Sequence, residues 1–385
     1  MDRKELLRRI YPLSMAPVSE GVDKANEILL NELPFEVLEY PSLAEHNGWT
    51  VPLNWEVKKA SIRKDGQLIY DGMQHPLCVM GYSNSFSGEI DLEELKKHLS
   101  YRKDMPECIG YHCDWYYKQH ARDWGFCMPY DQYQKLEPGK YEVELETVST
   151  PGKMKVLDLH IPGEKEDTII LNAHNCHAAQ ANDDVAGMVV GVEVAKRLMK
   201  RKNRYSYRLI IAPEHIGTVF YLANRDEGIT RKMKLGMFLE MLGNKNRFAL
   251  QKSFPGNTLM DRAALHYLRH RHPDFHSDEF RNIVGNDESV WEAPGYEIHT
   301  VSLSRAPYKE YHTNWDSDKL ISEKMLDEAA EAVMGILNIL ETDTTMKRKF
   351  KGLIALGNPK YDLYQLTVDP SIDRVVTNVQ HKWNK

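Results

Sequence analysis

Two histidines and two aspartates crowd into one short stretch of the chain, residues 174–184. His174 and His177 come first, and Asp183 and Asp184 close the stretch. Imidazole nitrogens and carboxylate oxygens are ligands that zinc takes in proteins, so the stretch is a candidate zinc site. A simpler interpretation is a polar loop before a helix, in which Asp183 or Asp184 caps the helix. The rest of the chain has to decide between the two.

The stretch lies between a predicted strand and a predicted helix. Residues 168–173 are apolar and rich in β-branched side chains, which is typical of a buried strand in a parallel sheet. Residues 185–201 carry apolar side chains at helical spacing and end in a basic turn, where cations interact favourably with the helix dipole. Ligands of open α/β sheets bind at the carboxyl ends of the strands. The loop is therefore well placed for a binding site.

Three later strands are also followed by residues that bind metals or transfer protons. These predicted strands span residues 207–212, 234–239 and 298–303. Unrelated loops seldom place glutamate and histidine only at one edge of a sheet, so the coincidence favours one site built from four strand ends. The residues that follow the three strands are, in order, Glu214 with His215, then Glu240, then His312.

Composition limits the class of protein. The chain has 385 residues, enough for one large α/β domain and a smaller one. Fifty Lys and Arg residues against 56 Asp and Glu give a net charge of −6 without an extended basic run, so we expect no nucleic-acid partner. Five cysteines lack paired zinc spacing and are expected to be reduced thiols. Without the apolar core of a signal peptide or of a membrane span, we expect a cytoplasmic protein with no membrane partner. The oligomeric state stays open.

The sequence predicts four parts. Residues 1–50 are expected to be the helical N-terminal part of the catalytic domain, and residues 51–150 a β-rich insert subdomain that contains a hairpin. Residues 151–345 alternate strands and helices and form the catalytic α/β domain; residues 346–385 are a C-terminal extension. The predicted fold class is α/β, a mixed and mainly parallel sheet with helices on both faces, plus a small β-rich subdomain.

Several short phrases of the chain occur together in one known protein family. They are Trp124-Gly125-Phe126-Cys127, Asp131-Gln132-Tyr133-Gln134-Lys135-Leu136, Cys176-His177 with Ala181-Asn182-Asp183, Pro213-Glu214 with Ile216-Gly217, and Tyr311-His312-Thr313. With this set the chain resembles the co-catalytic two-zinc aminopeptidase family, and within it a bacterial aminopeptidase-like branch that has a β-rich insert domain. The resemblance covers most of the chain from about residue 50 to 365. The spaced set is specific, whereas no single phrase is.

The resemblance implies two zinc ions and a role for each site residue. His177 and Glu240 would bind the first zinc, His312 would bind the second, and Asp183 would bridge the two, since a carboxylate spans metals about 3.5–4 Å apart. Glu214 would be the general base that takes a proton from zinc-bound water. The implied fold is the zinc aminopeptidase-like one already predicted.

His215 departs from the family's pattern. The family has a Glu-Glu pair where this chain has Glu214-His215, so a neutral imidazole replaces an anionic ligand. Neighbours on an extended strand point to opposite faces, which would keep one of the two away from the site. Pro213 and Gly217 bracket the pair, however, and predict that the strand has already ended in a turn. We therefore expect His215 to bind the second zinc.

Two further features concern the loop itself. Ala179 stands where the family has an aspartate, so the residue that orients His177 is unassigned. His174 is close enough in sequence to compete with His177 for the ligand role, and the resemblance favours His177. The family also implies a cis peptide bond between Asp183 and Asp184.

Together these residues predict a zinc-dependent hydrolase of amide or peptide bonds, of the aminopeptidase type, in which zinc-bound hydroxide attacks and Glu214 is the base. The expected partner is a small peptide or amide, held in part by Asp287, Glu288, Arg305 and Tyr311. One alternative is a metal-dependent amidohydrolase or deacylase that acts on a non-peptide conjugate in a biosynthetic pathway. Another is a non-catalytic binding protein that retains the fold, against which the presence of both base-type and ligand-type glutamates argues.

Overall fold

The computed structural model describes residues 2–175, 177–344, 347–361 and 363. The chain divides into two compact units, Met1–Glu341 and Thr342–Lys385. The expected boundaries at residues 50 and 150 fall inside the first unit and stay predictions. The expected extension, residues 346–385, falls in the second unit and lies largely outside the described residues.

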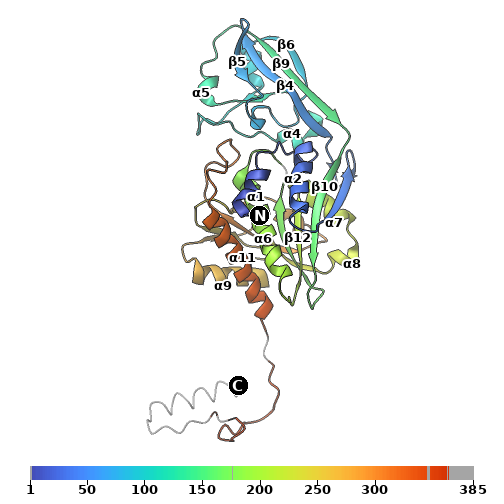
Figure 1. The fold of residues 1–385 in the computed structure, drawn as a ribbon, viewed down its shortest axis with the longest axis vertical. Helices are drawn as coiled ribbons and strands as arrows, with labels where there is room; N and C mark the ends of the chain where they lie inside the picture. Colours follow the sequence, from blue (N-terminus) through green and yellow to red (C-terminus); the bar gives the residue numbers. More distant parts are fainter. Residues whose placement is uncertain (1, 176, 345–346, 362, 364–385) are drawn as a thin grey trace. The chain divides into compact units, whose positions relative to one another are not determined.

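An eight-stranded sheet forms the centre of the first unit (Figure 1). Its order is β1-β10-β12-β11-β13-β16-β14-β15. The middle strands β12, β11, β13 and β16 run parallel, whereas β1 with β10, β10 with β12 and β14 with β16 are antiparallel pairs. The predicted mixed sheet is therefore confirmed. The strands are β1 (Glu36–Pro41), β10 (Lys153–Ile161), β11 (Thr168–His174), β12 (Ser206–Ala212), β13 (Met233–Leu239), β14 (Phe248–Gln251), β15 (His276–Asp278) and β16 (His299–Arg305).

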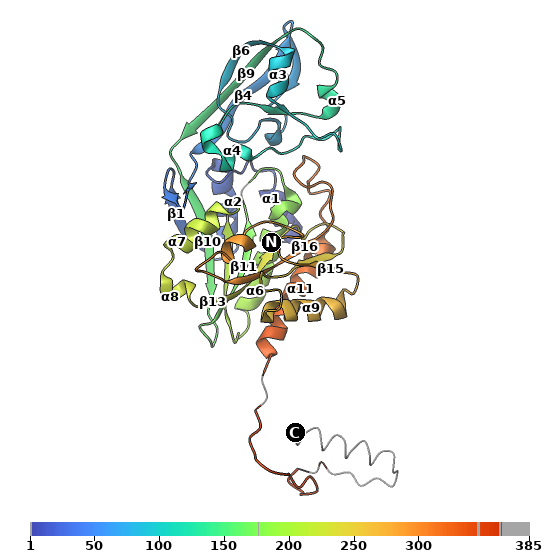
Figure 2. The ribbon, with the colours of Figure 1, turned by 180° about the vertical axis from the view of Figure 1, so that it is seen from behind.

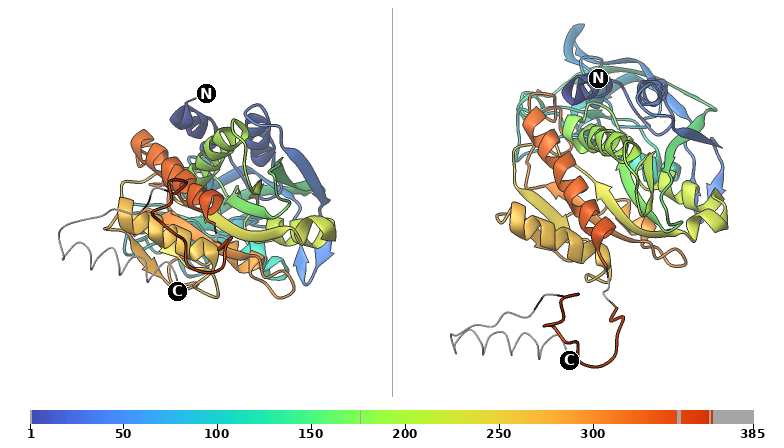
Figure 3. Two further views of the ribbon diagram at one scale, coloured as in Figure 1. Left: turned by 90° about the horizontal axis from the view of Figure 1, so that it is seen from below. Right: turned by 60° about the horizontal axis from the view of Figure 1, so that its bottom comes forward.

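Side chains of the middle strands alternate between two cores, because successive residues of a strand point to opposite faces. In β11, Ile169 and Leu171 enter the larger core and Ile170 enters the second. Helices α1, α2, α6, α9 and α11 supply the larger core, and α7 and α10 supply the second (Figures 2 and 3). Helices on both faces are thus confirmed. They are α1 (Arg3–Ile10), α2 (Glu20–Leu30), α6 (Ala186–Met199), α7 (Ile216–Asn224), α8 (Glu227–Thr230), α9 (Leu259–Arg271), α10 (Glu288–Trp291) and α11 (Glu323–Thr342).

Local sequence signals start several of these helices. Ser19 caps α2 by accepting the N–H of Val22. At α9, Thr258 and Asp261 form a reciprocal capping box that satisfies two backbone donors. Within the described part of the chain, no helix is long and apolar enough to cross a membrane.

A four-stranded antiparallel sheet, in the order β5-β4-β9-β6, confirms the small β-rich subdomain. Its own core contains Ile62, Leu95, Phe126 and Tyr141, all almost fully buried. The principal elements are β4 (Asn54–Lys64), β5 (Gln67–Asp71), β6 (Phe86–Asp91), α3 (Leu92–Lys97) and β9 (Lys140–Thr150). Shorter ones are β2 (Glu45–His46), β3 (Trp49–Thr50), β7 (Leu99–Ser100), α4 (Asp114–Tyr117), β8 (Phe126–Cys127) and α5 (Tyr130–Tyr133).

The N-terminal part, which was expected to be helical, contains α1 and α2 but also the strand β1. Residues 36–41 form a strand because the edge of β10 offers an antiparallel partner, with Tyr40 opposite Met154. The last helix, α11, begins at Glu323. The residues just before α11 make contacts of their own. Asp316 accepts backbone hydrogen bonds from residues 182 and 183, and Ile321 packs in the larger core.

A buried ion pair joins two strands of the sheet. Asp158 on β10 and Arg208 on β12 are 1% and 7% exposed, and an Arg208 Nη1 lies 2.5 Å from Asp158 Oδ2. Arg225, which follows α7, is 3.0 Å from the same oxygen, and the Tyr221 hydroxyl donates to it at 2.9 Å. A single carboxylate therefore orders two guanidinium groups and a hydroxyl from β12 and from the region of α7.

We expect Asp158→Ala to lower the free energy of unfolding by about 3–5 kcal/mol, because it leaves Arg208 buried without its counter-ion. Urea unfolding followed by circular dichroism measures this. Glu39→Ala is the control: it removes an exposed pair with Lys153 and should cost about 1 kcal/mol or less. Equal effects of the two substitutions would contradict the account.

Candidate metal centre

Three imidazoles surround the carboxylate of Asp183. His174 Nε2 lies 3.1 Å from Asp183 Oδ1, whereas His177 Nε2 and His312 Nε2 lie 3.5 Å and 3.3 Å from Oδ2. Asp183, His174 and His177 are buried, and the His312 side chain is 26% exposed. Asp183 Oδ1 therefore faces one imidazole, and Asp183 Oδ2 faces two.

The carboxyl edge of the sheet brings these residues together, as the strand-end argument predicts. His174 is the last residue of β11, and the loop after it supplies His177 and Asp183. Glu240 directly follows β13, and His312 lies in the loop after β16. Parallel strands end at the same edge, so residues far apart in sequence meet there.

Asp316 and Asn182 hold the loop that carries Asp183. Asp316 accepts the backbone N–H groups of Asn182 and Asp183 at 2.7 and 3.0 Å. The Asn182 side chain accepts from the backbone N–H groups of residues 243 and 244, which ties the loop to the end of β13. The peptide bond between Asp183 and Asp184 is cis, as the family resemblance implies.

Asp184 acts as a second clamp directly beside the site. Its carboxylate accepts the N–H groups of His174, Gly187 and Met241, so it joins the end of β11, the start of α6 and the end of β13. Gly187 is required here, because a Cβ at this position would lie 2.2 Å from the carbonyl oxygen of Leu239.

Each of the four site loops contains one non-glycine residue with a left-handed backbone. They are Ala179, His215, Met241 and His312, with φ between 52° and 55°. This conformation is uncommon for such residues and is often found where a loop is held for function. The concentration at one edge of the sheet supports a built site over independent loops.

Glu240 is buried beside Asp183 and is only partly satisfied. Its Oε1 accepts a hydrogen bond of 2.6 Å from the side-chain amide of Asn286, and its Oε2 has no hydrogen-bond partner among the described residues. Burial, together with repulsion from Asp183, raises the pKa of Glu240 well above its ordinary value. A cation at this point would favour the charged form instead.

The same electrostatic pattern extends around the site. Burial raises the pKa of Asp184 and of Asp316 well above the ordinary aspartate value. Burial opposes ionisation of Asp183 as well, but the three imidazoles that face its carboxylate hold its pKa well below the ordinary value. So many carboxylates in a buried volume create a strong preference for a cation.

Glu214 and His215 follow β12 as predicted, and the His215 side chain lies among aromatic rings. The His215 ring lies flat against Trp49 at 6.2 Å between centroids and edge-on to Tyr117 at 6.0 Å. His215 Nδ1 is 3.6 Å from Glu214 Oε1, and the His215 N–H donates to Asp287. The cluster of possible metal ligands within the described residues is His174, His177 and Asp183, without His215. A ligand role for His215 stays a prediction.

The residues expected to hold substrate mostly have partners inside the fold. Asp287 accepts from the His215 N–H and from Thr218, and burial raises its pKa to about 7. Glu288 accepts from the backbone N–H of residue 286 and from Gln251. Arg305 is 3% exposed, donates to backbone carbonyls and lies 3.9 Å from the centre of a phenyl ring. Their contacts support positioning of the site loops.

Tyr311 differs from those three, because its ring stacks on His312 at 3.8 Å and is 39% exposed. It lines a cavity of about 520 Å³ whose wall includes Glu240. A substrate that reaches the centre from this cavity would pass Tyr311.

The β-rich subdomain contacts two of the site loops. The N–H of Tyr111 donates to the His312 carbonyl at 2.8 Å, and its ring lies 5.1 Å from that of His177. The Tyr116 hydroxyl donates to the Glu214 carbonyl at 3.1 Å. The subdomain therefore helps to position both the candidate base and a candidate ligand.

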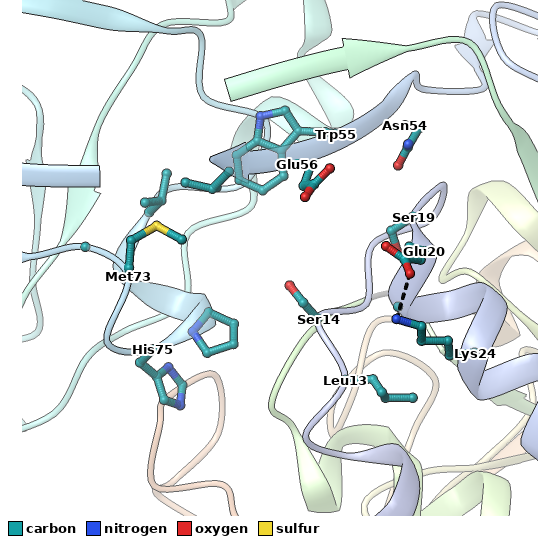
Figure 4. Close-up of a pocket in the computed structure, with 15 residues that line it drawn as sticks. Leu13, Ser14, Ser19, Glu20, Lys24, Asn54, Trp55, Glu56, Met73 and His75 are labelled. Carbon is teal, nitrogen blue, oxygen red and sulfur yellow. Dashed lines mark ion pairs between the residues drawn. The ribbon is translucent and has the colours of Figure 1, made fainter. Parts of the chain in front are cut away.

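A different cavity, of about 390 Å³, lies beside α2 and β4 (Figure 4). Its acids Glu20 and Glu56 pair with Lys24 at 2.7 Å and with Lys58 at 2.5 Å, and His75 accepts a backbone N–H through Nδ1. Its lining residues include none of the strand-end residues. The cavity that adjoins the candidate centre is therefore the one beside Glu240.

The residues at the centre fit a metal ion. Several buried polar atoms have no hydrogen-bond partner among the described residues, although such atoms are normally satisfied. These atoms are His177 Nε2, Asp183 Oδ2, Glu240 Oε2 and His312 Nε2. Nitrogen and carboxylate donors of this kind are the ones that zinc takes in proteins.

The chain matches one family model over residues 4–343, that of the family described as "Domain of unknown function (DUF4910)". The chain belongs to this family. A Clostridium acetobutylicum protein, named for polysaccharide biosynthesis and an aminopeptidase-like domain, is 28% identical over 343 residues, which are 88% of this chain and 78% of that protein.

Solved structures share the fold of this DUF4910 chain. A Clostridium acetobutylicum crystal structure described as a peptidase has a TM-score of 0.82 and 27% identity, over 89% of this chain and 81% of that one. A zinc aminopeptidase from Bacillus subtilis has a TM-score of 0.66 and 12% identity, over 90% and 96% of the two chains. The aminopeptidase-like fold is confirmed, while membership of the two-zinc family stays a prediction.

Three residues of the candidate site make contacts that the sequence did not indicate. His174 was weighed only as a competitor of His177, although its place at the last position of a buried strand was a usable signal. Asp316 and Asn286 hold Asp183 and Glu240 from distant loops, and no local spacing indicates either contact.

We expect Asp316→Ala to weaken zinc binding by this DUF4910 chain by about 10–100-fold, because groups that orient ligands have effects of this size. Competition with a chromophoric chelator measures the affinity. Asp318→Ala is the matched control, since Asp318 pairs with Arg8 in a partly exposed contact and should leave the affinity unchanged. An unchanged affinity in Asp316→Ala would contradict the positioning role.

Proposed function

We propose that this DUF4910 chain is a zinc-dependent hydrolase that cleaves an amide or peptide bond. The observation that carries the proposal is the convergence of three imidazoles on Asp183, with Glu240 buried beside it and its Oε2 without a hydrogen-bond partner among the described residues. The aminopeptidase-like fold supports the same reaction class, because its zinc-containing relatives are aminopeptidases.

The contacts divide the proposed ligands into two sets. We assign His174, Asp183 and Glu240 to the first set, because His174 faces Asp183 Oδ1 and Glu240 is buried beside Asp183. His177 and His312 face Asp183 Oδ2 and form the second set with it. Asp183 belongs to both sets and would bridge two ions. His177 thus takes the position that the sequence-based prediction assigned to His215.

Zinc bound there would polarise the scissile carbonyl and lower the pKa of a coordinated water. Glu214 is the proposed general base: its side chain is 16% exposed, so it remains accessible from solvent, and its carbonyl is held by Tyr116. It would take a proton from the attacking water and deliver it to the leaving amine. Tyr311, stacked on His312 at the mouth of the centre, would lie beside the reacting carbonyl.

A second candidate substrate class is a non-peptide conjugate such as an acylated amino sugar. The name of the Clostridium acetobutylicum relative, which refers to polysaccharide biosynthesis, supports it. The same residues would serve both classes, since both reactions hydrolyse an amide. Assays with aminoacyl amides, dipeptides and N-acyl sugars would separate them, and no turnover of any would favour a binding protein.

We expect Glu214→Gln to retain zinc and fold but to lose about 10²–10⁴-fold in kcat, because the variant lacks a general base. Steady-state kinetics and elemental analysis of the same sample measure both quantities. The control is Glu297→Gln, which changes an exposed residue and should leave kcat unchanged. Glu292 is not suitable as a control, because its carboxylate accepts a backbone N–H. Full turnover by Glu214→Gln would mean that another residue is the base.

The ligand sets predict different zinc stoichiometries for two histidine variants. We expect His177→Ala to lose one of two ions and His215→Ala to keep both, because His177 contacts Asp183 and His215 lies against Trp49. Elemental analysis after zinc loading and dialysis measures the ratio, with thermal unfolding as a check on folding. Loss of an ion from His215→Ala alone would restore the sequence-based ligand set.

A further inference from the structure

The cavity beside Glu240 has an unusual distribution of charge. Three segments line it: the end of β13, residues 281–286 and residues 306–311. Only two of its lining residues carry a charged side chain, Glu240 and Arg281. Glu240 already accepts a hydrogen bond from Asn286 and belongs to the proposed metal ligands. The charge left for a bound molecule is therefore that of Arg281.

Arg281 is exposed and without a counter-ion. Among the residues that the structure describes, none forms an ion pair or a hydrogen bond with its guanidinium. Its backbone is left-handed, with φ of 61°. A Cβ added to Gly285 would lie 3.3 Å from Arg281 Nη2, so the guanidinium lies over this glycine. Gly285 precedes Asn286, the residue that contacts Glu240.

The loop that presents Arg281 is held in place by the protein. Gln251 accepts the N–H groups of Ile283 and Val284 through its side-chain oxygen, and its amide donates to Glu288. The side chain of Asn282, next to Arg281, donates to Asp278 at 3.0 Å. An anchored loop offers a cation at a defined place, which reduces the ordering cost of binding.

We propose that Arg281 binds a carboxylate of the substrate, so that the preferred substrates are amides that carry a carboxylate near the scissile bond. A guanidinium presents a planar fork of donors that matches a carboxylate with two parallel hydrogen bonds. The proposal rests on the proposed amide hydrolysis and names the substrate class. It makes Arg281 a specificity residue.

The same cavity is poorly suited to a free α-ammonium group. Such a group needs an acidic or carbonyl partner, and the acid on this wall, Glu240, is already shared with Asn286 and the proposed metal. A nearby guanidinium would also repel a second cation. The cavity therefore favours N-acylated amino acids, or the carboxylate end of a dipeptide, over the amino end of a long peptide.

Matched pairs of probes test the proposal. N-benzoylglycine and glycyl-phenylalanine carry the carboxylate on the amine side of the amide, and N-succinyl-benzylamine carries it on the acyl side; each is compared with its carboxamide. Calorimetry with zinc-loaded protein in a Glu214→Gln background measures binding without turnover. Hydrogen bonds to a charged group lead us to expect a preference for the carboxylate of about 10–100-fold for at least one pair.

Arg281→Gln should remove that preference and leave the affinity for the carboxamide and the zinc content unchanged. Arg281→Lys should retain part of it, because the charge remains but the fork is lost. Arg269→Gln, at an exposed position of α9, is the control and should behave as the parent. The proposal is overturned if no pair shows a preference, or if Arg281→Gln leaves it intact.

Hydrolysis and binding separate the two proposals. A carboxylate preference that depends on Arg281, without hydrolysis of any probe by the parent, would contradict the proposed function and support the role of Arg281. Hydrolysis of carboxylate and carboxamide probes at equal kcat/KM by the parent would support the function and overturn the specificity.

Discussion

The candidate centre depends on the buried carboxylate of Asp183. Removing a charged group from water is costly unless other groups replace the water, and three imidazoles do so here. The imidazoles offer limited compensation, especially since Glu240 adds a second buried carboxylate beside the first. The excess of acid in this volume is the physical reason why the geometry fits metal cations. It also explains why the loop around Asp183 is clamped so firmly, by Asp184 and Asp316.

The arrangement of the chain follows from the need to hold that carboxylate. Four parallel strands end at one edge of the sheet and bring their loops together. Backbone contacts then fix the loops to one another, and the β-rich subdomain adds contacts through Tyr111 and Tyr116. The subdomain is therefore a support for the centre as well as a domain with its own core. A loop held from two sides can keep the left-handed residues that the site loops contain.

Charge is distributed unevenly across the site. The acids lie deep, where they favour a metal, and Arg281 lies on the wall of the adjoining cavity, where it favours an anion. A bound metal would neutralise the acids and leave the guanidinium as the main charge that a substrate meets. The buried acids would then bind the metal, and the accessible Arg281 would select the substrate.

The sequence alone determined the four parallel strands of the sheet, the order of the loops after them and the residue types at the sheet edge. It could do so because a buried strand shows a local apolar pattern, and because the strand-end rule places Glu214, Glu240 and His312 at one edge. Only the tertiary structure decided which side chains face Asp183. The contact of Asp316 with its backbone spans 133 residues, and the direction of His215 depends on the distant Trp49. Those choices depend on how loops pack against one another, which no local spacing encodes.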